Sequence, residues 1–118
     1  MSRFNYAIFP IRLRSARKVK GLSQECLGIL AGIDESSASA RMNQYETGKY
    51  APDFLMAKKI AEVLDVPTAY FYTEDDLMAE MVLKFHAFPK NGNLPSYFFL
   101  ELLFPIYYNG YSICPLHL

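Results

Sequence analysis

Residues 22–50, LSQECLGILAGIDESSASARMNQYETGKY, constrain the fold more than any other part of this chain. Two short amphipathic segments meet here around Gly32, and glycine favours a turn at such a point. In the first segment Ser23 is a typical helix N-cap, because its hydroxyl can accept a hydrogen bond from a backbone N–H. Apolar residues then recur at helical spacing and predict a buried face: Cys26, Leu27, Leu30 and Ile33.

The second segment runs from about Ser36 to Tyr45 and predicts a helix that ends at Gly48. Ala38, Met42 and Tyr45 form its inner stripe at positions i, i+4 and i+7. The opposite face carries small or polar side chains: Ser36, Ser37, Ser39, Ala40, Arg41, Asn43 and Gln44. Lys and Glu usually fill a solvated face, whereas Ser and Asn lower helix stability by up to about 0.7 kcal/mol each. This face therefore fits a DNA major groove, where Asn and Gln pair with adenine and Arg with guanine.

Four sequence motifs here resemble the Cro/cI-type, or xenobiotic-response-element, family of helix-turn-helix transcriptional regulators. They are GLSQE, AGI at the turn, YETGKYAP after the second segment, and KIAEVLDVP further on, and the resemblance spans residues 11–72. Twelve residues separate Ile33 from Glu46, about one helical turn more than the common family pattern has. The sequence matches a longer variant of the family, and the extra turn leaves the base-reading positions open.

The resemblance implies an all-α fold, a small bundle of about five helices of the phage-repressor DNA-binding type. We expect a DNA-binding domain at residues 8–73, an additional helix at 74–88 and an aromatic-rich hydrophobic tail at 89–118. Gln24 resembles the glutamine with which the family holds a DNA phosphate, with backbone N–H groups and the helix dipole assisting, and Ser23 before it is also expected to bind DNA. Lys49 and Tyr50 are expected to reach the DNA backbone. Tyr45 belongs to the inner stripe, and Glu46 resembles the family position that pairs with an arginine of the first helix.

The residues before this motif predict a first helix over residues 11–19 that ends at Gly21. Its apolar positions are Ile11 or Ile8, Leu13, Ala16 and Val19. Basic residues lie between them: Arg12, Arg14, Arg17, Lys18 and Lys20. Two interpretations of this basic face stay open, simple solvation and contact with DNA phosphates. The N-terminal sequence has no long apolar run or small-residue cleavage site, so we expect no secretory signal.

The residues after the motif predict three more helices. Asp53 is the expected N-cap of a structural helix whose apolar face comprises Leu55, Ala57, Ile60, Ala61 and Leu64. A short helix over residues 68–72 and a longer one over 77–85 follow, separated by Glu74, Asp75 and Asp76. Consecutive carboxylates do not face one another on a helix, so these three indicate a solvated helix start and not a metal site.

Charge is distributed unevenly along the chain. Residues 1–60 hold ten Lys and Arg against five Asp and Glu, whereas residues 61–118 hold two against seven, so the halves carry about +5 and −5. The basic half therefore suits nucleic acid although the whole chain is neutral. Two cysteines, Cys26 and Cys114, indicate no disulfide framework, and Cys26 is expected in the core. We expect a reduced, cytoplasmic location in a bacterial or phage-derived system.

The tail at residues 89–118 resembles no part of the family. Its run LPSYFFLELLFPIYY is shorter than the roughly 20 apolar residues that span a bilayer and contains Glu101 and Pro105, so we expect no membrane insertion. Three interpretations stay open: a dimer-forming or partner-binding surface, a segment that folds back on the helices, and a changed reading frame.

Enzymatic function has little support in the sequence. The two histidines, His86 and His117, lie apart from each other and from any nucleophile, and we find no phosphate loop, metal-ligand spacing or catalytic serine motif. We expect no enzyme activity and no cofactor. The sequence instead predicts a transcriptional regulator, a repressor, that binds double-stranded DNA sequence-specifically as a homodimer on a palindromic operator, with half-sites about 34 Å apart. The alternative is an antitoxin-like or other protein-interaction helical module.

Overall fold

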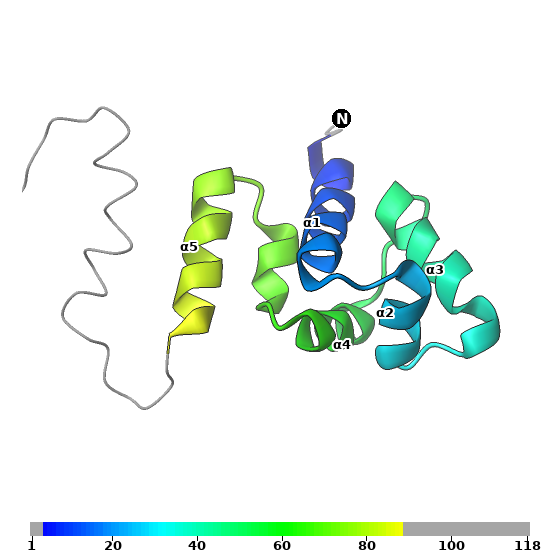
Figure 1. Cartoon of the computed structure of the whole chain (residues 1–118). Coiled ribbons are helices and arrows are strands. Elements are labelled where there is room, and N and C mark those ends of the chain that lie inside the picture. Colours follow the sequence, from blue (N-terminus) through cyan, green and yellow to red (C-terminus); the bar gives the residue numbers. More distant parts are fainter. Residues whose placement is uncertain (1–3, 89–118) are drawn as a thin grey trace, which may run out of the picture. The chain divides into compact units, whose positions relative to one another are not determined.

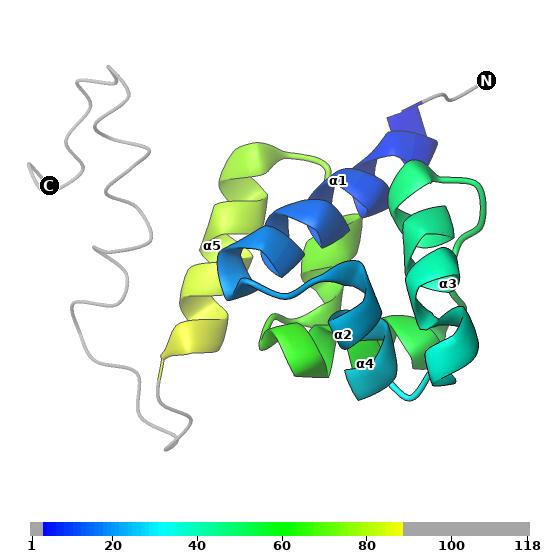
Figure 2. The same cartoon turned by 45° about the vertical axis from the view of Figure 1, so that its right-hand side comes forward.

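The computed structural model describes residues 4–88, and the side chains of residues 8–88, as a helical bundle (Figures 1 and 2). This part of the chain contains no strand, and its secondary structure consists of helices and the turns between them. The elements are, in chain order, α1 (Phe4–Lys20), α2 (Gln24–Leu30), α3 (Glu35–Thr47), α4 (Phe54–Leu64), the 3-10 helix η1 (Thr68–Tyr72) and α5 (Asp76–Ala87). The expected all-α fold is confirmed.

One hydrophobic core holds these helices together, and every element contributes a buried side chain to it. Its largest fully buried side chains are Leu13, Leu27, Met42, Ile60 and Phe71. Burial of an aliphatic or aromatic side chain of this size contributes about 1.5 to 3 kcal/mol. The core therefore fixes the positions of α2 and α3 relative to α1 and α4.

Helices α2 and α3 pack against each other extensively, and Gly28 makes this close packing possible. A Cβ atom built on Gly28 would lie 2.8 Å from the Cβ of Ala38 and 2.9 Å from its carbonyl oxygen. No side chain fits at that distance without a shift of the α3 backbone. A glycine followed ten residues later by alanine thus allows the two helices of the motif to pack closely at Gly28 and Ala38.

The predicted inner stripe of α3 is confirmed, because Ala38, Met42 and Tyr45 are all buried. Capping also follows the sequence signals. The Ser23 hydroxyl accepts a hydrogen bond from the backbone N–H of Cys26 at 3.0 Å, and α3 ends at Gly48, whose φ of 80° is left-handed. Glycine adopts that conformation without steric penalty, so it ends the helix sharply.

The first helix differs from the expectation in its start and in its buried face. It begins at Phe4 and continues through Pro10, so the prediction that it starts at Ile11 is wrong. Ile11 and Val19 are 57% and 86% exposed, whereas Phe9 is buried. The predicted Leu13 and Ala16 are buried, Phe9 joins them on the inward face, and the Phe9 ring packs against Phe71 with centroids 5.0 Å apart.

Arg12 is also buried, although the sequence placed it on a solvated or phosphate-binding face. Its guanidinium donates to the carbonyl oxygens of Thr73 and Glu74, at 3.0 Å each, and pairs with Asp76 at 3.0 Å. Arg12 therefore ties α1 to the start of α5. It offers no charge to a ligand.

Beyond α1, three further apolar residues that the sequence assigned to the core are exposed, and these assignments are wrong: Cys26, Leu30 and Leu55. In α2 the contact of Gly28 with α3 turns Leu27 and Ala31 inward, so Cys26 and Leu30 lie away from the core. In α4 the face that contains Ala57 and Ile60 is buried, and Leu55 lies on the opposite side.

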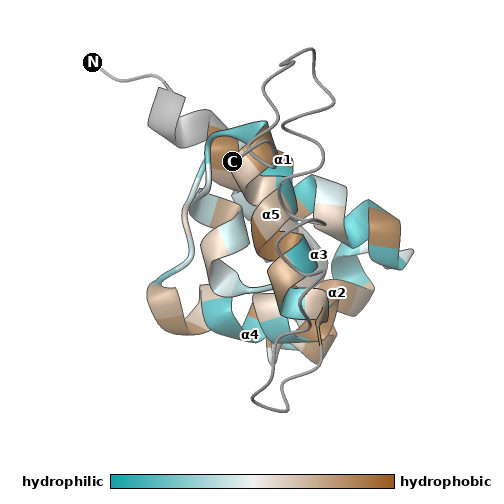
Figure 3. Cartoon of the chain, turned by 90° about the vertical axis from the view of Figure 1, so that its left-hand side faces the viewer, coloured by the Kyte–Doolittle hydropathy of each residue, from teal (hydrophilic) through white to brown (hydrophobic). Residues whose placement is uncertain are grey.

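The last described helix, α5, has one fully buried residue, Ala79, and a mixture of apolar and polar residues along its length (Figure 3). The Asp75 carboxylate accepts a hydrogen bond from the backbone N–H of Met78 at 2.8 Å, which confirms that the acidic residues begin a helix. His86 pairs with Asp65 at the end of α4, with 3.1 Å between Nε2 and Oδ1.

None of the helices in residues 4–88 has the length and hydrophobicity that a membrane-spanning helix needs. The expectations for residues 89–118, including those for Cys114 and His117, lie outside the described residues.

Candidate nucleic-acid interface

The outer face of α3 carries the residues that the sequence singled out as a recognition surface. None of them belongs to the core: Ser36, Ser39, Ala40, Arg41 and Asn43 are exposed, and Ser37 and Gln44 are half-buried. The opposite face is anchored by the stripe from Ala38 to Tyr45. The longer helix that the twelve-residue spacing predicted is present as a single continuous element of 13 residues.

The first turn of α3 is organised by Asp34, its N-cap. The Asp34 carboxylate accepts hydrogen bonds from the hydroxyl of Ser36 and, at 3.0 Å, from its backbone N–H. These two bonds lower the pKa of the Asp34 carboxyl below its ordinary value. The Ser37 hydroxyl donates to the Asp34 carbonyl oxygen at 3.4 Å. Ser36 and Ser37 thus donate hydrogen bonds to the N-cap residue Asp34. The carboxylates of Asp34 and Glu35 make this end of α3 acidic.

Behind the outer face, Glu46 joins α1, α2 and α3 through one buried carboxylate. Arg17 donates to it from Nε at 2.5 Å and from Nη2 at 3.1 Å, which confirms the predicted pairing with an arginine of the first helix. Gln24 donates from Nε2 at 3.0 Å, and Arg14 Nε lies 3.5 Å away. Burial alone raises the pKa of the Glu46 carboxyl, but the bonds from Arg17 and Gln24 and the charges of Arg17 and Arg14 outweigh it, so the pKa is lowered.

Gln24 and Asn43 meet at the surface, although nineteen positions separate them. Gln24 Nε2 donates to Asn43 Oδ1 at 3.3 Å, in addition to its bond with Glu46. The first residue of α2 and the third turn of α3 therefore form one continuous polar surface. This contact leaves no signal in the sequence, because it depends on how closely α2 and α3 approach each other at Gly28.

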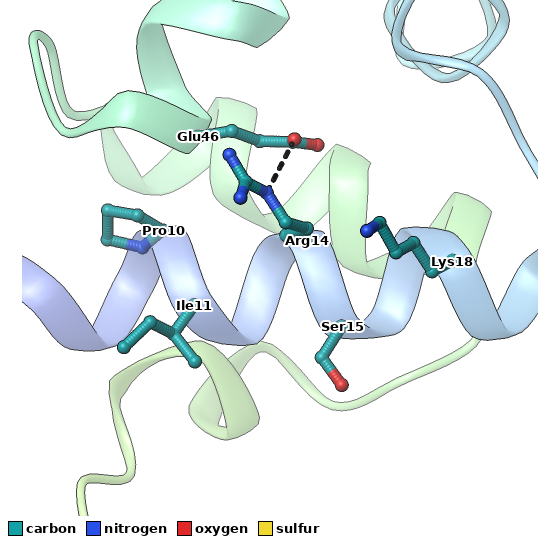
Figure 4. A pocket seen from close by; sticks show the side chains of 6 residues that line it. All are labelled: Pro10, Ile11, Arg14, Ser15, Lys18 and Glu46. Atoms are coloured by element: carbon teal, nitrogen blue, oxygen red, sulfur yellow. Dashed lines mark ion pairs between the residues drawn. The ribbon is translucent and has the colours of Figure 1, made fainter.

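The basic residues of α1 do not act as one face. Arg12 and Arg17 are committed to partners inside the protein, whereas Lys18 and Lys20 are exposed. Arg14 has a half-exposed side chain directed at Glu46, and with Lys18 it lines a shallow cavity beside α1 (Figure 4). Fewer basic side chains on α1 are therefore accessible to DNA than the sequence predicted.

The loop after α3 presents Lys49 and Tyr50, both exposed. The Lys49 ammonium lies 5.9 Å from the centre of the Tyr50 ring, within range of a cation–π interaction. Ser23 is exposed at the other end of the motif, at the N-terminus of α2. Within residues 8–88 no group of three or more His, Cys, Asp or Glu side chains is arranged to hold a metal ion.

Two functional features escaped the sequence interpretation. Asp34 is the N-cap of α3, and an aspartate directly before ESSASA is a signal that could have found it. The anchoring role of Arg12 had no such signal, because its three partners lie more than sixty positions away.

Comparison with known proteins places this geometry in a family. The family model HTH_3, described as helix-turn-helix, matches residues 13–71, which are 59 of the 118 residues. The crystal structure of the transcriptional regulator BswR is similar, with 43% sequence identity, a TM-score of 0.66, and coverage of 82% of this chain and 90% of that chain. No curated protein gives a significant match. The matched residues contain the whole two-helix motif with its supporting helices, and this chain belongs to the HTH_3 helix-turn-helix family, the Cro/cI-type group that its sequence resembles.

Proposed function

We propose that this protein regulates transcription by binding double-stranded DNA sequence-specifically, with α3 in the major groove. The observation that carries the proposal is the outer face of α3, which has short polar side chains and Ala40 at its centre while its inner face is locked in the core. A helix with this profile can approach base edges closely. Membership of a helix-turn-helix family and the likeness to a transcriptional regulator support the same conclusion.

Residues around α3 divide into two groups by the chemistry they offer. Ser39, Arg41, Asn43 and Gln44 carry donors and acceptors that suit base edges, and Ser36, Ser37 and Ala40 complete the surface that enters the groove. Ser23, Lys49 and Tyr50 flank this surface and suit phosphate contacts, which position a protein without specifying sequence. Arg14 and Lys18 supply further charge from α1.

We propose repression as the mode of action and a palindrome as the target. A protein bound across a promoter excludes polymerase by occupancy alone, so repression needs no further surface. One α3 reads only a few base pairs, so a two-fold homodimer with half-sites about 34 Å apart gives a usable site. In this arrangement residues 8–73 form the DNA-binding domain, residues 74–88 an additional helix, and residues 89–118 supply dimer or partner contacts.

Selection of bound duplexes from a random-sequence pool tests the proposal. The expected result is enrichment of a two-fold symmetric motif, followed by specific binding in a titration and reduced transcription from a promoter that contains the site. Failure to enrich any motif, with no measurable affinity for duplex DNA at low salt, would reject DNA binding. The antitoxin-like alternative, a protein-interaction module, would then become the better interpretation.

A further inference from the structure

A cavity of about 280 Å³ opens on the surface beside α1, close to the C-terminal end of α3 (Figure 4). Its volume lies near the lower end of the range for small-molecule sites, about 300 to 1,000 Å³, so it fits a small ligand. Two neighbouring rows of α1 side chains line it, because residues four apart lie on one face of a helix. The lining residues are Pro10, Ile11, Arg14, Ser15, Lys18 and, from α3, Glu46.

Hydrogen-bond donors line the half of the cavity nearer the C-terminus of α1. Arg14 Nε lies 3.5 Å from Glu46 Oε1, beyond the roughly 2.7 to 3.2 Å of an N–H···O hydrogen bond, so the guanidinium keeps its donors. Neither the Ser15 hydroxyl nor the Lys18 ammonium has a hydrogen-bond or ion-pair partner among residues 8–88. Guanidinium and ammonium groups only donate hydrogen bonds, so this half of the cavity suits an anion.

The carboxylate in the lining does not oppose an anion. Both oxygens of Glu46 accept bonds from Arg17, at 2.5 and 3.1 Å, and Oε1 also accepts from Gln24 at 3.0 Å. The Glu46 side chain is fully buried, whereas Arg14 and Lys18 are exposed. The charge of Glu46 is thus balanced inside the protein, and the two cations leave the cavity positive.

Pro10 and Ile11 make the other half of the cavity apolar. Ile11 is 57% exposed, so a large aliphatic side chain borders the cavity in contact with water. A DNA phosphate would use the cations and leave this wall uncovered, whereas an anion with an apolar chain would cover both. The two halves are roughly five residues apart along a helix that rises about 1.5 Å per residue, so such a ligand would span about 8 Å.

We propose that this cavity binds a small aliphatic carboxylate. Its carboxylate accepts hydrogen bonds from Arg14, Ser15 and Lys18, and its chain covers Pro10 and Ile11. Arg14 and Lys18 are the α1 cations assigned to DNA phosphates, so a bound carboxylate neutralises them and weakens DNA binding. This effect on DNA rests on the proposed function, whereas binding of the carboxylate does not.

Three probes test the binding on the full chain by NMR titration of the backbone amides. Octanoate carries both groups, inorganic phosphate only the charge, and octanol only the chain. Octanoate should shift the amides of residues 10–18 and bind about tenfold or more tightly than either other probe, because it alone uses both halves of the cavity. Octanoate that binds no better than phosphate or octanol, or that shifts only amides elsewhere, would overturn the proposal.

Ile11→Ser separates this site from general attraction to exposed apolar surface. The variant should bind octanoate about tenfold more weakly, because the wall for the chain is lost, and should keep the wild-type affinity for DNA. Leu55→Ser is the matched control, since Leu55 lies on α4 and is 59% exposed, and it should bind octanoate like the wild type. Equal weakening by both variants would overturn the proposal.

Competition with the duplex selected from the random pool tests the effect on DNA. Saturating octanoate should weaken binding about tenfold or more and change the log–log salt slope from about −2.7 to about −0.9 per protomer, because two of about three phosphate contacts are lost. Octanoate that occupies the cavity but changes neither affinity nor slope would overturn the release of DNA. Absence of affinity for any duplex would instead reject the proposed function, and the NMR titration would still decide whether the cavity binds a carboxylate.

Discussion

Replacement of Glu46 by glutamine removes one charge at the point where α1, α2 and α3 meet. The side chain keeps its size, but one carboxylate oxygen becomes an NH₂ group that faces the donors of Arg17. Glu46 is fully buried and the Arg17 side chain is only 14% exposed. Breaking a buried ion pair from one side destabilises a protein by about 3 to 5 kcal/mol. Arg17 reaches some solvent and Arg14 is half-exposed, so we expect Glu46→Gln to lower the free energy of unfolding by about 2 to 4 kcal/mol.

The same contacts predict how this loss depends on pH. The pKa of Glu46 in the folded protein lies below its ordinary value of 4.5, so the folded state holds its proton less tightly than the unfolded state. The stabilisation is therefore complete above the unfolded pKa and is lost as pH falls through the folded pKa. The difference between wild type and Glu46→Gln should be full at pH 7 and should shrink once the pH falls below 4.5.

Urea unfolding followed by circular dichroism at pH 7 and at pH values below 4.5 measures both effects. Glu62→Gln is the matched control, because Glu62 is an exposed acid on α4 and its loss should change stability by less than about 0.5 kcal/mol. A Glu46→Gln variant that unfolds like wild type at pH 7 would show that this buried ion pair does not stabilise the fold. A stability difference between wild type and Glu46→Gln that stays the same at low pH would also contradict this role, since that difference would not come from the charge of Glu46.

Three further predictions follow from packing and charge. Gly28→Ala should destabilise the protein by about 1 to 3 kcal/mol although alanine favours helix by about 1 kcal/mol, because the added Cβ meets the backbone of Ala38; a variant more stable than wild type in thermal melting would contradict this. Met42→Ala should lower the free energy of unfolding by about 2 to 5 kcal/mol, since Met42 is fully buried; wild-type melting with loss of DNA binding would instead place Met42 at the groove. Affinity for duplex DNA should fall with salt at a log–log slope of about −2.7 per protomer, from about three phosphate contacts by Arg14, Lys18 and Lys49; a titration series without salt dependence would exclude these contacts.

Local sequence patterns predicted much of the fold, because helix periodicity and capping act over a few residues. The stripe of Ala38, Met42 and Tyr45 and the cap at Ser23 are of this kind, and both are confirmed. Helix periodicity gave wrong predictions of buried residues where the packing of a neighbouring helix determines which face turns inward. Cys26 fits an apolar stripe equally well in sequence, but the contact of Gly28 with Ala38 rotates it to the surface.

The start of α1 was mispredicted because of Pro10. Proline is usually found at the beginning of a helix or after its end, whereas Pro10 lies inside α1. The candidate site was predictable in outline, since the outer face of α3 follows from its inner stripe. Its internal connections were not, because the bonds that join Gln24 to Asn43 and Glu46 cross between helices. Such contacts depend on tertiary packing, and their residues carry no shared pattern in the sequence.

Ala40 offers the most direct test of the claim that the outer face of α3 enters DNA. Ala40 is exposed at the centre of that face, so Ala40→Glu should leave melting unchanged and place a carboxylate against the groove and its phosphates. The measurement is a fluorescence anisotropy titration of the selected duplex with this variant and with Lys59→Glu, which alters an exposed residue of α4 and changes net charge by twice as much. Ala40→Glu is expected to weaken binding about 100-fold or more, because like charges brought together cost several kcal/mol, while Lys59→Glu should weaken it only a few-fold. Equal affinities for Ala40→Glu and the wild type would contradict the claim that the outer face of α3 enters DNA.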